Sequence, residues 1–284
     1  MSEFGSQSYT INNRTVYLKW IKANVDKIVP TYIGYNNITD TDYCGVNGTF
    51  FIPNSSLDSS ALTRTILWGI AMDSNGEIGA YGRANRYTEN YWSPNGNTPL
   101  ACGTFVNLNK KLSDGTVLFC DKIDSFDNYY HNGIRVRQSD VSWAIGGTSL
   151  FMNKTYSSAE EYYNDISDED PPRPRAIAQR TAIAYLGGNS LGNNILLLTV
   201  FGDNVTGSDL SAYDSGGVTL FELRQILKDI WNVPYIAIAL DGGGSTQIQY
   251  RNNGIKNYQV VNSSPTYSTK TKRDVFSILR VTDM

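Results

Sequence analysis

Residues 235–250 read YIAIALDGGGSTQIQY, an apolar run followed by three consecutive glycines and an alternating segment. The apolar run at 235–240 is short and continuous, which predicts a strand in the interior of a sheet. Polar and apolar residues alternate again over 245–250, and RNNGI at 251–255 predicts a turn. The predicted order is therefore strand, glycine loop, strand. A dinucleotide-binding loop leads into a helix and a P-loop ends in Lys-Ser/Thr, so neither fits.

Three consecutive glycines between an acid and two hydroxyls indicate a place where the main chain approaches something closely. Successive glycine N–H groups are able to form an anion-binding nest. Asp241, Ser245 and Thr246 add polar groups at the end of a strand. We favour a functional loop, and the alternative is a purely structural glycine bulge.

The composition narrows the class of protein. The chain has 284 residues, 40% hydrophobic and only 18% charged, with 19 Tyr and 25 Gly, which is typical of a protein rich in strands and loops. A net charge of −3 recruits neither nucleic acid nor anionic membranes, and no apolar segment is long enough for a membrane span. Three cysteines without CxxC spacing and a single histidine make a zinc site improbable. We expect no metal and no cofactor.

Other segments predict the remaining elements. Residues 180–186 and 195–201 are apolar runs separated by GGNSLGNN, so we expect an antiparallel hairpin. One clear amphipathic helix is predicted at about 220–231, where Thr219 and Glu222 form a capping box at its start. A weaker helix is expected over 158–165, a hairpin over 65–82, and an exposed loop over 167–175. The predicted fold class is α+β, an extensive and mostly antiparallel sheet system with few helices.

Two motifs look catalytic and are better explained otherwise. Gly188-Asn-Ser-Leu-Gly192 matches a nucleophile elbow, but it lies between two strands and no histidine follows it. His131 is expected to be a loop residue, so acid–base chemistry falls to carboxylates. Asn47-Gly48 is a turn pair that predicts a hairpin, although Asn47 would equally present its amide to a sugar or phosphate.

Arg180 and Glu222 each have two interpretations. Arg180 stands at the mouth of an apolar strand, and a guanidinium suits bidentate binding of phosphate; the alternative is a surface arginine at a strand start. Glu222 is a candidate catalytic carboxylate, although the capping box already accounts for it.

Six clusters occur in an order that resembles the phosphodiester glycosidase family. They are NGTFF (47–51), WAIGGTSLF (143–151), QRTAIA (179–184), ILLLTVFG (195–202), TLFEL (219–223) and LDGGGST (240–246). The closing segment is also similar, with Val261-Asn262, Lys272-Arg273 and VFSILRV (275–281). The resemblance is strongest over 43–281. The chain departs from the family pattern at Thr49, Ala184 and Phe201; the first two narrow the space around the expected site and the third removes an acid.

The resemblance implies a hydrolase that cleaves a sugar-1-phosphate linkage in a phosphodiester and releases free sugar. It implies Asp241, Arg180 and Glu222 as catalytic residues. It further implies a substrate-binding set of Asn47, Gly48, Thr181, Gly242, Gly243, Gly244, Ser245, Thr246 and Arg273. The expected partner is a sugar phosphate or glycan phosphodiester, with no nucleic-acid polymer and no membrane insertion.

Two other functions stay open. The fold would also suit a carbohydrate- or teichoic-acid-binding module of a phage tail or cell surface, for which Tyr81, Tyr91 and Trp92 offer rings for stacking sugars. A phage enzyme acting on a small cytoplasmic sugar phosphate or nucleotide-derived signal is the third reading. A homo-oligomer is open as well.

The chain is expected to form one domain over 7–284. Residues 1–6, MSEFGS, read as a cloning scar, and no basic and apolar signal segment follows. The location is therefore left open between cytoplasm, virion and the outside of a cell from which a signal was removed.

Overall fold

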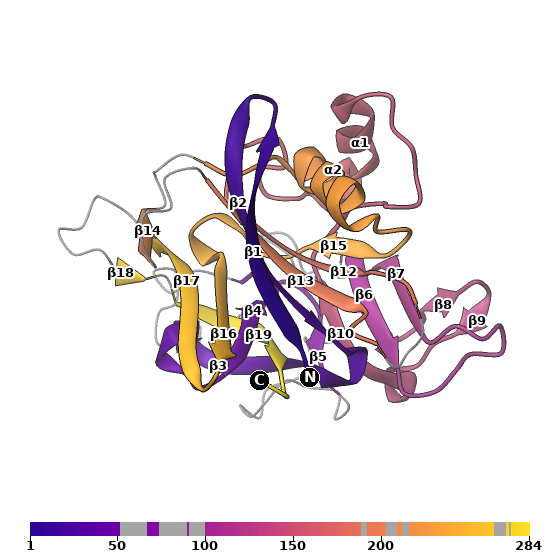
Figure 1. Cartoon of the computed structure of the whole chain (residues 1–284). Helices are drawn as coiled ribbons and strands as arrows, with labels where there is room; N and C mark the ends of the chain where they lie inside the picture. The colour runs from indigo at the N-terminus through magenta and orange to yellow at the C-terminus, as the bar shows by residue number, and fades with distance from the viewer. Residues whose placement is uncertain are drawn as a thin grey trace, which may run out of the picture.

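The computed structural model describes residues 1–51, 67–73, 90, 100–188, 192–202, 209–211, 216–263, 271–272 and 274–284. A six-stranded sheet, here called the first sheet, runs through the middle of the molecule (Figure 1). Every neighbouring pair in it is antiparallel. Its order is β1 (Glu3–Ile11), β2 (Arg14–Ala23), β13 (Ile195–Phe201), β12 (Arg180–Tyr185), β15 (Ala237–Ala239) and β11 (Thr148–Ser149).

The first sheet confirms two predictions from apolar runs. β12 and β13 pair as the expected antiparallel hairpin, with Arg180 opposite Val200. β15 lies between β12 and β11, inside the sheet, as its continuous apolar sequence predicts. Strands with both faces covered need apolar residues at every position, and all seven residues of β13 are buried.

Two further sheets pack beside the first. The second sheet has β14 (Asp209–Ser211), β17 (Ile255–Ser263), β16 (Gln247–Asn252), β4 (Cys44–Asn47), β19 (Val275–Val281) and β3 (Ile28–Asn36), with β18 (Thr271–Lys272) beside β17. The third sheet has β5 (Ala71–Met72), β10 (Val141–Gly146), β6 (Cys102–Leu108) and β7 (Leu118–Ile123). β8 (Tyr130–His131) and β9 (Ile134–Arg135) form a small ribbon. Only β14 and β17 pair in parallel among the described strands.

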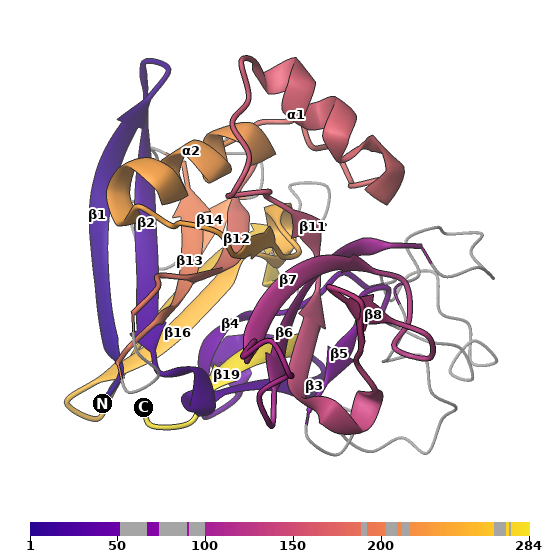
Figure 2. The ribbon, with the colours of Figure 1, turned by 90° about the vertical axis from the view of Figure 1, so that its right-hand side faces the viewer.

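Both faces of the first sheet carry a core. On one face Leu198, Leu196 and Ala182 pack with the helices α1 (Ala159–Asp165) and α2 (Leu220–Trp231). On the other face Leu197 and Ile183 pack with apolar residues of the second and third sheets. The helices thus cover one side and the second and third sheets the other (Figures 1 and 2). The predicted α+β class, the helix at 220–231 and the short helix at 158–165 are confirmed.

Two local predictions are wrong. The Asn47-Gly48 pair does not close a hairpin, because the described neighbours of β4 are β16 and β19, both distant in sequence. Residues 167–175 are not uniformly exposed. Glu169 is 1% exposed, and its carboxylate accepts hydrogen bonds from Gly103 N (3.0 Å) and Ser149 N (2.9 Å). Glu169 thereby joins the third sheet to the first. The acidic sequence around it predicted a solvated side chain instead.

The N-terminal residues are part of the fold. Glu3–Ser6 pair with Lys19–Lys22 inside β1, and Phe4 stacks on Tyr250 with ring centroids 4.4 Å apart. Their origin as a cloning scar stays a prediction. The hairpin predicted over 65–82 lies mostly outside the described residues, which in that region include β5.

Candidate functional site

The glycine loop joins two sheets. β15 of the first sheet ends at Ala239, and β16 of the second sheet begins at Gln247. Between them Gly243–Ser245 form a single 3-10 turn. Asp241 and the three glycines are half-buried, so the loop reaches the surface. The sequence order of strand, glycine loop and strand is confirmed, and the loop is the crossing point between the sheets.

Asn47 holds this crossing in place. Its Oδ1 accepts hydrogen bonds from Thr181 Oγ1 (2.6 Å) on β12 and from Gln247 N (3.1 Å) on β16. Its Nδ2 donates to the carbonyl of Asp241 (2.7 Å). Asn47 is 1% exposed and Thr181 is fully buried, so both side chains act within the protein. The structure brings the two residues to the loop as predicted, but in a positioning role.

The glycines are explained by close approach and by conformation. A Cβ on Gly242 would stand 2.8 Å from the carbonyl oxygen of Gln179 and 3.5 Å from Arg180 Cδ. Gly243 has φ +57°, which side chains rarely adopt, and the space beside it is open. The loop therefore packs tightly on the start of β12 at Gly242 and faces open space at Gly243.

The amides of the loop are partly used within the protein. Gly242 N donates to Asp241 Oδ1 (2.8 Å), and Gly243 N donates to the carbonyl of Gln179 (2.8 Å). Among the described residues, Gly244 N has no acceptor. Of the three amides in the predicted nest, only the N–H group of Gly244 is therefore available to bind a ligand.

Arg180 is buried against this loop. It is 7% exposed, and it donates from Nε to the carbonyl of Val218 (3.0 Å). Its Nη2 donates to the carbonyls of Arg173 (2.9 Å) and Ala176 (2.7 Å), which leaves Nη1 for another partner. The interpretation as a surface arginine is therefore wrong.

The charge of Arg180 lacks a close counterpart. Within the described part of the chain, no carboxylate lies within ion-pair distance of this guanidinium. Burial lowers the pKa of Arg180 to about 10, whereas the tyrosines Tyr162 and Tyr163 and the carboxylate of Asp241 act in the opposite direction. The group is cationic at neutral pH. A buried cation bound only by carbonyl dipoles is a site for an anion.

Glu222 is engaged elsewhere. Its Oε2 accepts from Thr219 N (2.9 Å), which completes the predicted capping box. Its Oε1 accepts from Asn12 Nδ2 (2.6 Å) and pairs with Arg14 Nη2. Burial alone would raise the pKa of Glu222, but these donors lower it overall. Each of these contacts belongs to the helix start and the β1–β2 turn, so the cap explains this residue.

Four buried hydroxyls flank the crossing point. Ser245 and Thr246, both predicted, are fully buried, and neither hydroxyl oxygen has a hydrogen-bond partner among the residues that the structure describes. The same holds for Thr49 and Ser277, which sequence reasoning did not select. Gly48, also predicted, donates from its N to the carbonyl of Ser277 (2.8 Å) and accepts from Asp241 N (3.2 Å). Thr49 had a signal in the sequence, because it replaces a family glycine.

Some candidates lie outside the described residues. These are Arg273 of the substrate-binding set, together with Tyr81, Tyr91 and Trp92. Within the described part, no group of three or more His, Cys, Asp or Glu side chains is arranged to hold a metal ion, and the three cysteines are free. Neither of the described helices has the length and apolar content of a bilayer span.

The comparisons with known proteins place the chain in a family. The profile of the family described as phosphodiester glycosidase matches residues 69–282, which include Arg180 and the whole glycine loop. The chain belongs to the phosphodiester glycosidase family, as its six ordered motifs predict. A comparison with curated proteins gives no match.

Among solved structures, the chain is similar to the crystal structure of a hypothetical protein from Synechocystis, at 17% identity and a TM-score of 0.44. That similarity covers 98% of this chain and 62% of the other, so the chain spans about three fifths of that protein.

Proposed function

We propose that the protein hydrolyses sugar-1-phosphodiesters by breaking the bond between the anomeric carbon and the phosphate oxygen. The observation that carries this proposal is Arg180, a buried cation beside Asp241 and Gly242 with its Nη1 still available. A phosphodiester supplies one negative charge and two unesterified oxygens, which match Nη1 of Arg180 and the Gly244 amide. The family membership supports the same class of reaction.

The chemistry needs little help at the leaving group. When the C1–O bond breaks, its electron pair goes to the phosphate oxygen, and a phosphate monoester is already a good leaving group. Arg180 offsets the charge that develops there, and such preorganised stabilisation is often the largest catalytic contribution. Positive charge develops on the sugar ring, where the carboxylate of Asp241 would stabilise it or assist the attacking water. Water then adds to C1 and forms the hydroxyl group of the free sugar. The proton that this water loses goes to the released phosphate monoester or to solvent.

Asp241 suits this role by its position. Its backbone is fixed at both ends, since its N donates to the carbonyl of Gly48 and its carbonyl accepts from Asn47. Its Oδ1 accepts from Gly242 N, which orients the carboxylate. Asp241 is half-buried and borders the open space at Gly243. Glu222 is not required in this scheme.

The test is a panel of sugar-1-phosphodiesters, with methyl esters of sugar 1-phosphates, nucleotide sugars and teichoic-acid fragments. We expect free sugar from the wild type, a fall of about 10²- to 10⁴-fold for Asp241→Asn, and no effect of prior EDTA treatment. Asp229→Asn, an exposed acid on α2 that accepts from Tyr9 OH, is the control and retains the rate. Tight retention of a compound without any release of sugar would favour a binding module instead.

A further inference from the structure

A polar pocket lies away from the glycine loop. It has a volume of about 760 Å³ and is lined by residues of β7, of β11, of the 151–154 loop and of the end of α1. Tyr235 and Ala237, at the start of β15, complete it. Asp241 follows the other end of the same strand. The pocket and the glycine loop are therefore connected through β15 and are separate sites.

Both lysines that line this pocket are paired with acids, and the third acid of its wall, Asp121, accepts a hydrogen bond from Tyr129. Lys122 Nζ pairs with Asp168 Oδ1 (2.5 Å) and lies 3.4 Å from Glu169 Oε1. Lys154 Nζ pairs with Asp165 Oδ2 (2.6 Å). Because each lysine has an acid partner, the pocket does not select an anion in the way that Arg180 does. Its polar groups suit an uncharged ligand.

Unengaged amides are available for such a ligand. Asn153 and Asn164 line the pocket and are exposed, and in the described part of the chain neither side-chain amide has a hydrogen-bond partner. An amide both donates and accepts, and the paired carboxylates still have acceptor capacity. A ligand bearing many hydroxyl groups would satisfy donors and acceptors together.

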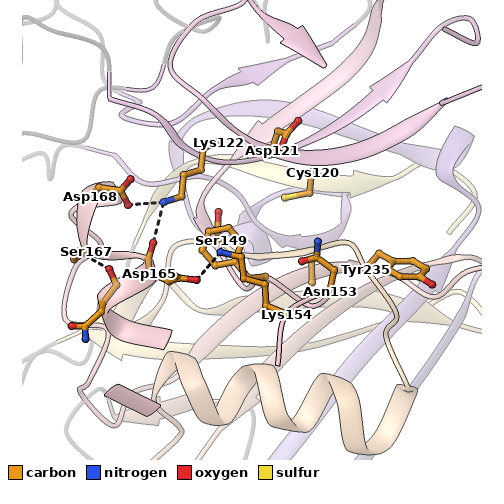
Figure 3. Close-up of a pocket in the computed structure, with 13 residues that line it drawn as sticks. Cys120, Asp121, Lys122, Ser149, Asn153, Lys154, Asp165, Ser167, Asp168 and Tyr235 are labelled. Carbon is orange, nitrogen blue, oxygen red and sulfur yellow. Dashed lines mark hydrogen bonds and ion pairs between the residues drawn. The ribbon is translucent and has the colours of Figure 1, made fainter. Parts of the chain in front are cut away.

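Two aromatic side chains supply apolar surface. Tyr235 is 70% exposed, although large apolar rings usually avoid water, and Figure 3 shows it at one end of the pocket, with the Lys122–Asp168 pair at the other. Phe151 lies beneath both lysines, whose Nζ atoms stand 5.2 Å and 4.3 Å from its ring centroid.

The backbone of Phe151, at the wall of the pocket, is strained. Its φ is +42°, an unusual value for a bulky residue, and such strain clusters at ligand sites. Arg224 holds this conformation by donating to the carbonyls of Leu150 (2.9 Å) and Phe151 (3.3 Å).

We propose that this pocket binds the uncharged part of a glycan, with one sugar ring stacked on Tyr235 and hydroxyls along the glycan bonded by Asn153 and Asn164. A sugar ring has the required combination of an apolar C–H face and a polar rim. If the proposed function holds, on which this last step rests, the substrate is a glycan phosphodiester. The pocket holds its glycan chain while the residues at the glycine loop cleave the sugar-1-phosphate linkage.

The experiment is calorimetric titration of the full chain with two probes, maltohexaose and chitohexaose. We expect at least one to bind in the millimolar range or tighter, and Tyr235→Ala and Asn153→Ala each to weaken binding by about tenfold. Tyr17→Ala, which removes a half-exposed tyrosine on β2 near the opposite edge of the first sheet, leaves the affinity unchanged.

Absence of binding for both probes up to about 10 mM, or equal affinity in wild type and Tyr235→Ala, would overturn the pocket proposal. The titration is repeated in Asp241→Asn, which retains binding if the two sites are separate. Binding of a hexasaccharide without hydrolysis of any compound in the sugar-1-phosphodiester panel would refute the proposed function and keep the pocket. Hydrolysis of a sugar-1-phosphodiester without binding of either hexasaccharide would keep the proposed function and overturn the pocket.

Discussion

Two buried arginines of this chain have similar surroundings and, on our account, different roles. Arg180 and Arg224 are 7% and 4% exposed, and each donates to three backbone carbonyls. Burial lowers the pKa of both. Arg224 fixes the 150–154 segment and lies over the ring of Tyr156, whereas Arg180 lies against Gly242. Replacing each arginine in turn therefore distinguishes a loss of stability from a loss of catalysis.

Arg180→Lys is therefore predicted to lower kcat/KM for a sugar-1-phosphodiester by about 10²-fold, roughly 2.7 kcal/mol of transition-state stabilisation. A lysine retains the charge but cannot keep the three carbonyl bonds and still reach the phosphate. Steady-state kinetics on the folded fraction measures this.

The matched control is Arg224→Lys. It loses a comparable set of hydrogen bonds, and its unfolding free energy falls by a comparable amount. It keeps kcat/KM within about threefold for a methyl phosphodiester of a sugar 1-phosphate, which does not extend into the Tyr235 pocket, since Arg224 has no contact with the glycine loop. Equal losses of activity in the two variants would show that Arg180 acts only through stability.

At the level of elements, the contacts at the start of α2 give the carboxylate of the TLFEL motif a structural role. Thr219 and Glu222 exchange hydrogen bonds between side chain and backbone, and Arg14 and Asn12 from the β1–β2 turn attach that turn to the helix. The helix is thereby fixed on the first sheet near Val218, whose carbonyl holds Arg180. Glu222 supports the site through the position of the helix.

Glu222→Gln is predicted to lower the unfolding free energy by about 1–2 kcal/mol at pH 7, because the ion pair with Arg14 is lost while a glutamine still caps the helix. The folded-state pKa of Glu222 is below its ordinary value. Its stabilising contribution is thus present above the unfolded pKa and disappears as pH falls through the folded pKa. Urea denaturation of wild type and variant from pH 7 to about 3 should show the two curves converging.

The same variant tests the role of Glu222 in catalysis. With the cap as its function, the specific activity of folded Glu222→Gln stays near that of wild type. A loss of 10²-fold or more at constant folded fraction would return Glu222 to the catalytic residues.

At the scale of the whole molecule, the site lies where the first and second sheets meet. The glycine loop carries the chain from one sheet to the other, and Asn47 bonds to β12, to β16 and to the loop itself. A single buried amide thus ties three segments whose positions define Asp241 and Arg180. Stability and site geometry are coupled at this residue.

Asn47→Ala is predicted to lower the unfolding free energy by about 2–4 kcal/mol, because three hydrogen bonds are lost and their buried partners are left unsatisfied. Chemical denaturation provides the value. Asn47→Asp keeps the two acceptor contacts but sets a buried carboxylate oxygen against the carbonyl of Asp241, so it should also lower the unfolding free energy. A loss below about 0.5 kcal/mol for Asn47→Ala would contradict the role as a tie.

The sequence predicted the features that depend on local pattern. The helix at 220–231, its cap, the β12–β13 hairpin and the interior position of β15 all follow from spacing and apolar runs of neighbouring residues. Partners distant in sequence leave no such pattern. Nothing near Asn47-Gly48 indicates that β4 pairs with β16 and β19, so a hairpin was the natural expectation. The sequence predicted a solvated Glu169, because the two amides that donate to it lie in β6 and β11, which are distant from it in the chain.

The ordered motifs selected the glycine loop and Arg180 as candidate site residues, but they gave no information on the geometry of these residues. That Arg180 is buried, bonded to three carbonyls and short of an acid partner among the described residues depends on the 173–176 loop folding back over β12. The pocket beside Tyr235 combines residues from four separate segments, and no spacing of residues in the sequence predicts it.

The most direct test of the central claim is hydrolysis of a methyl phosphodiester of a sugar 1-phosphate in water labelled with ¹⁸O. Cleavage at the anomeric carbon places the label on C1 of the released sugar and none on methyl phosphate, as mass spectrometry of both products would show. This is the result we predict. Label in the phosphate would mean attack at phosphorus, and the assignment of Asp241 to the sugar side would then be wrong.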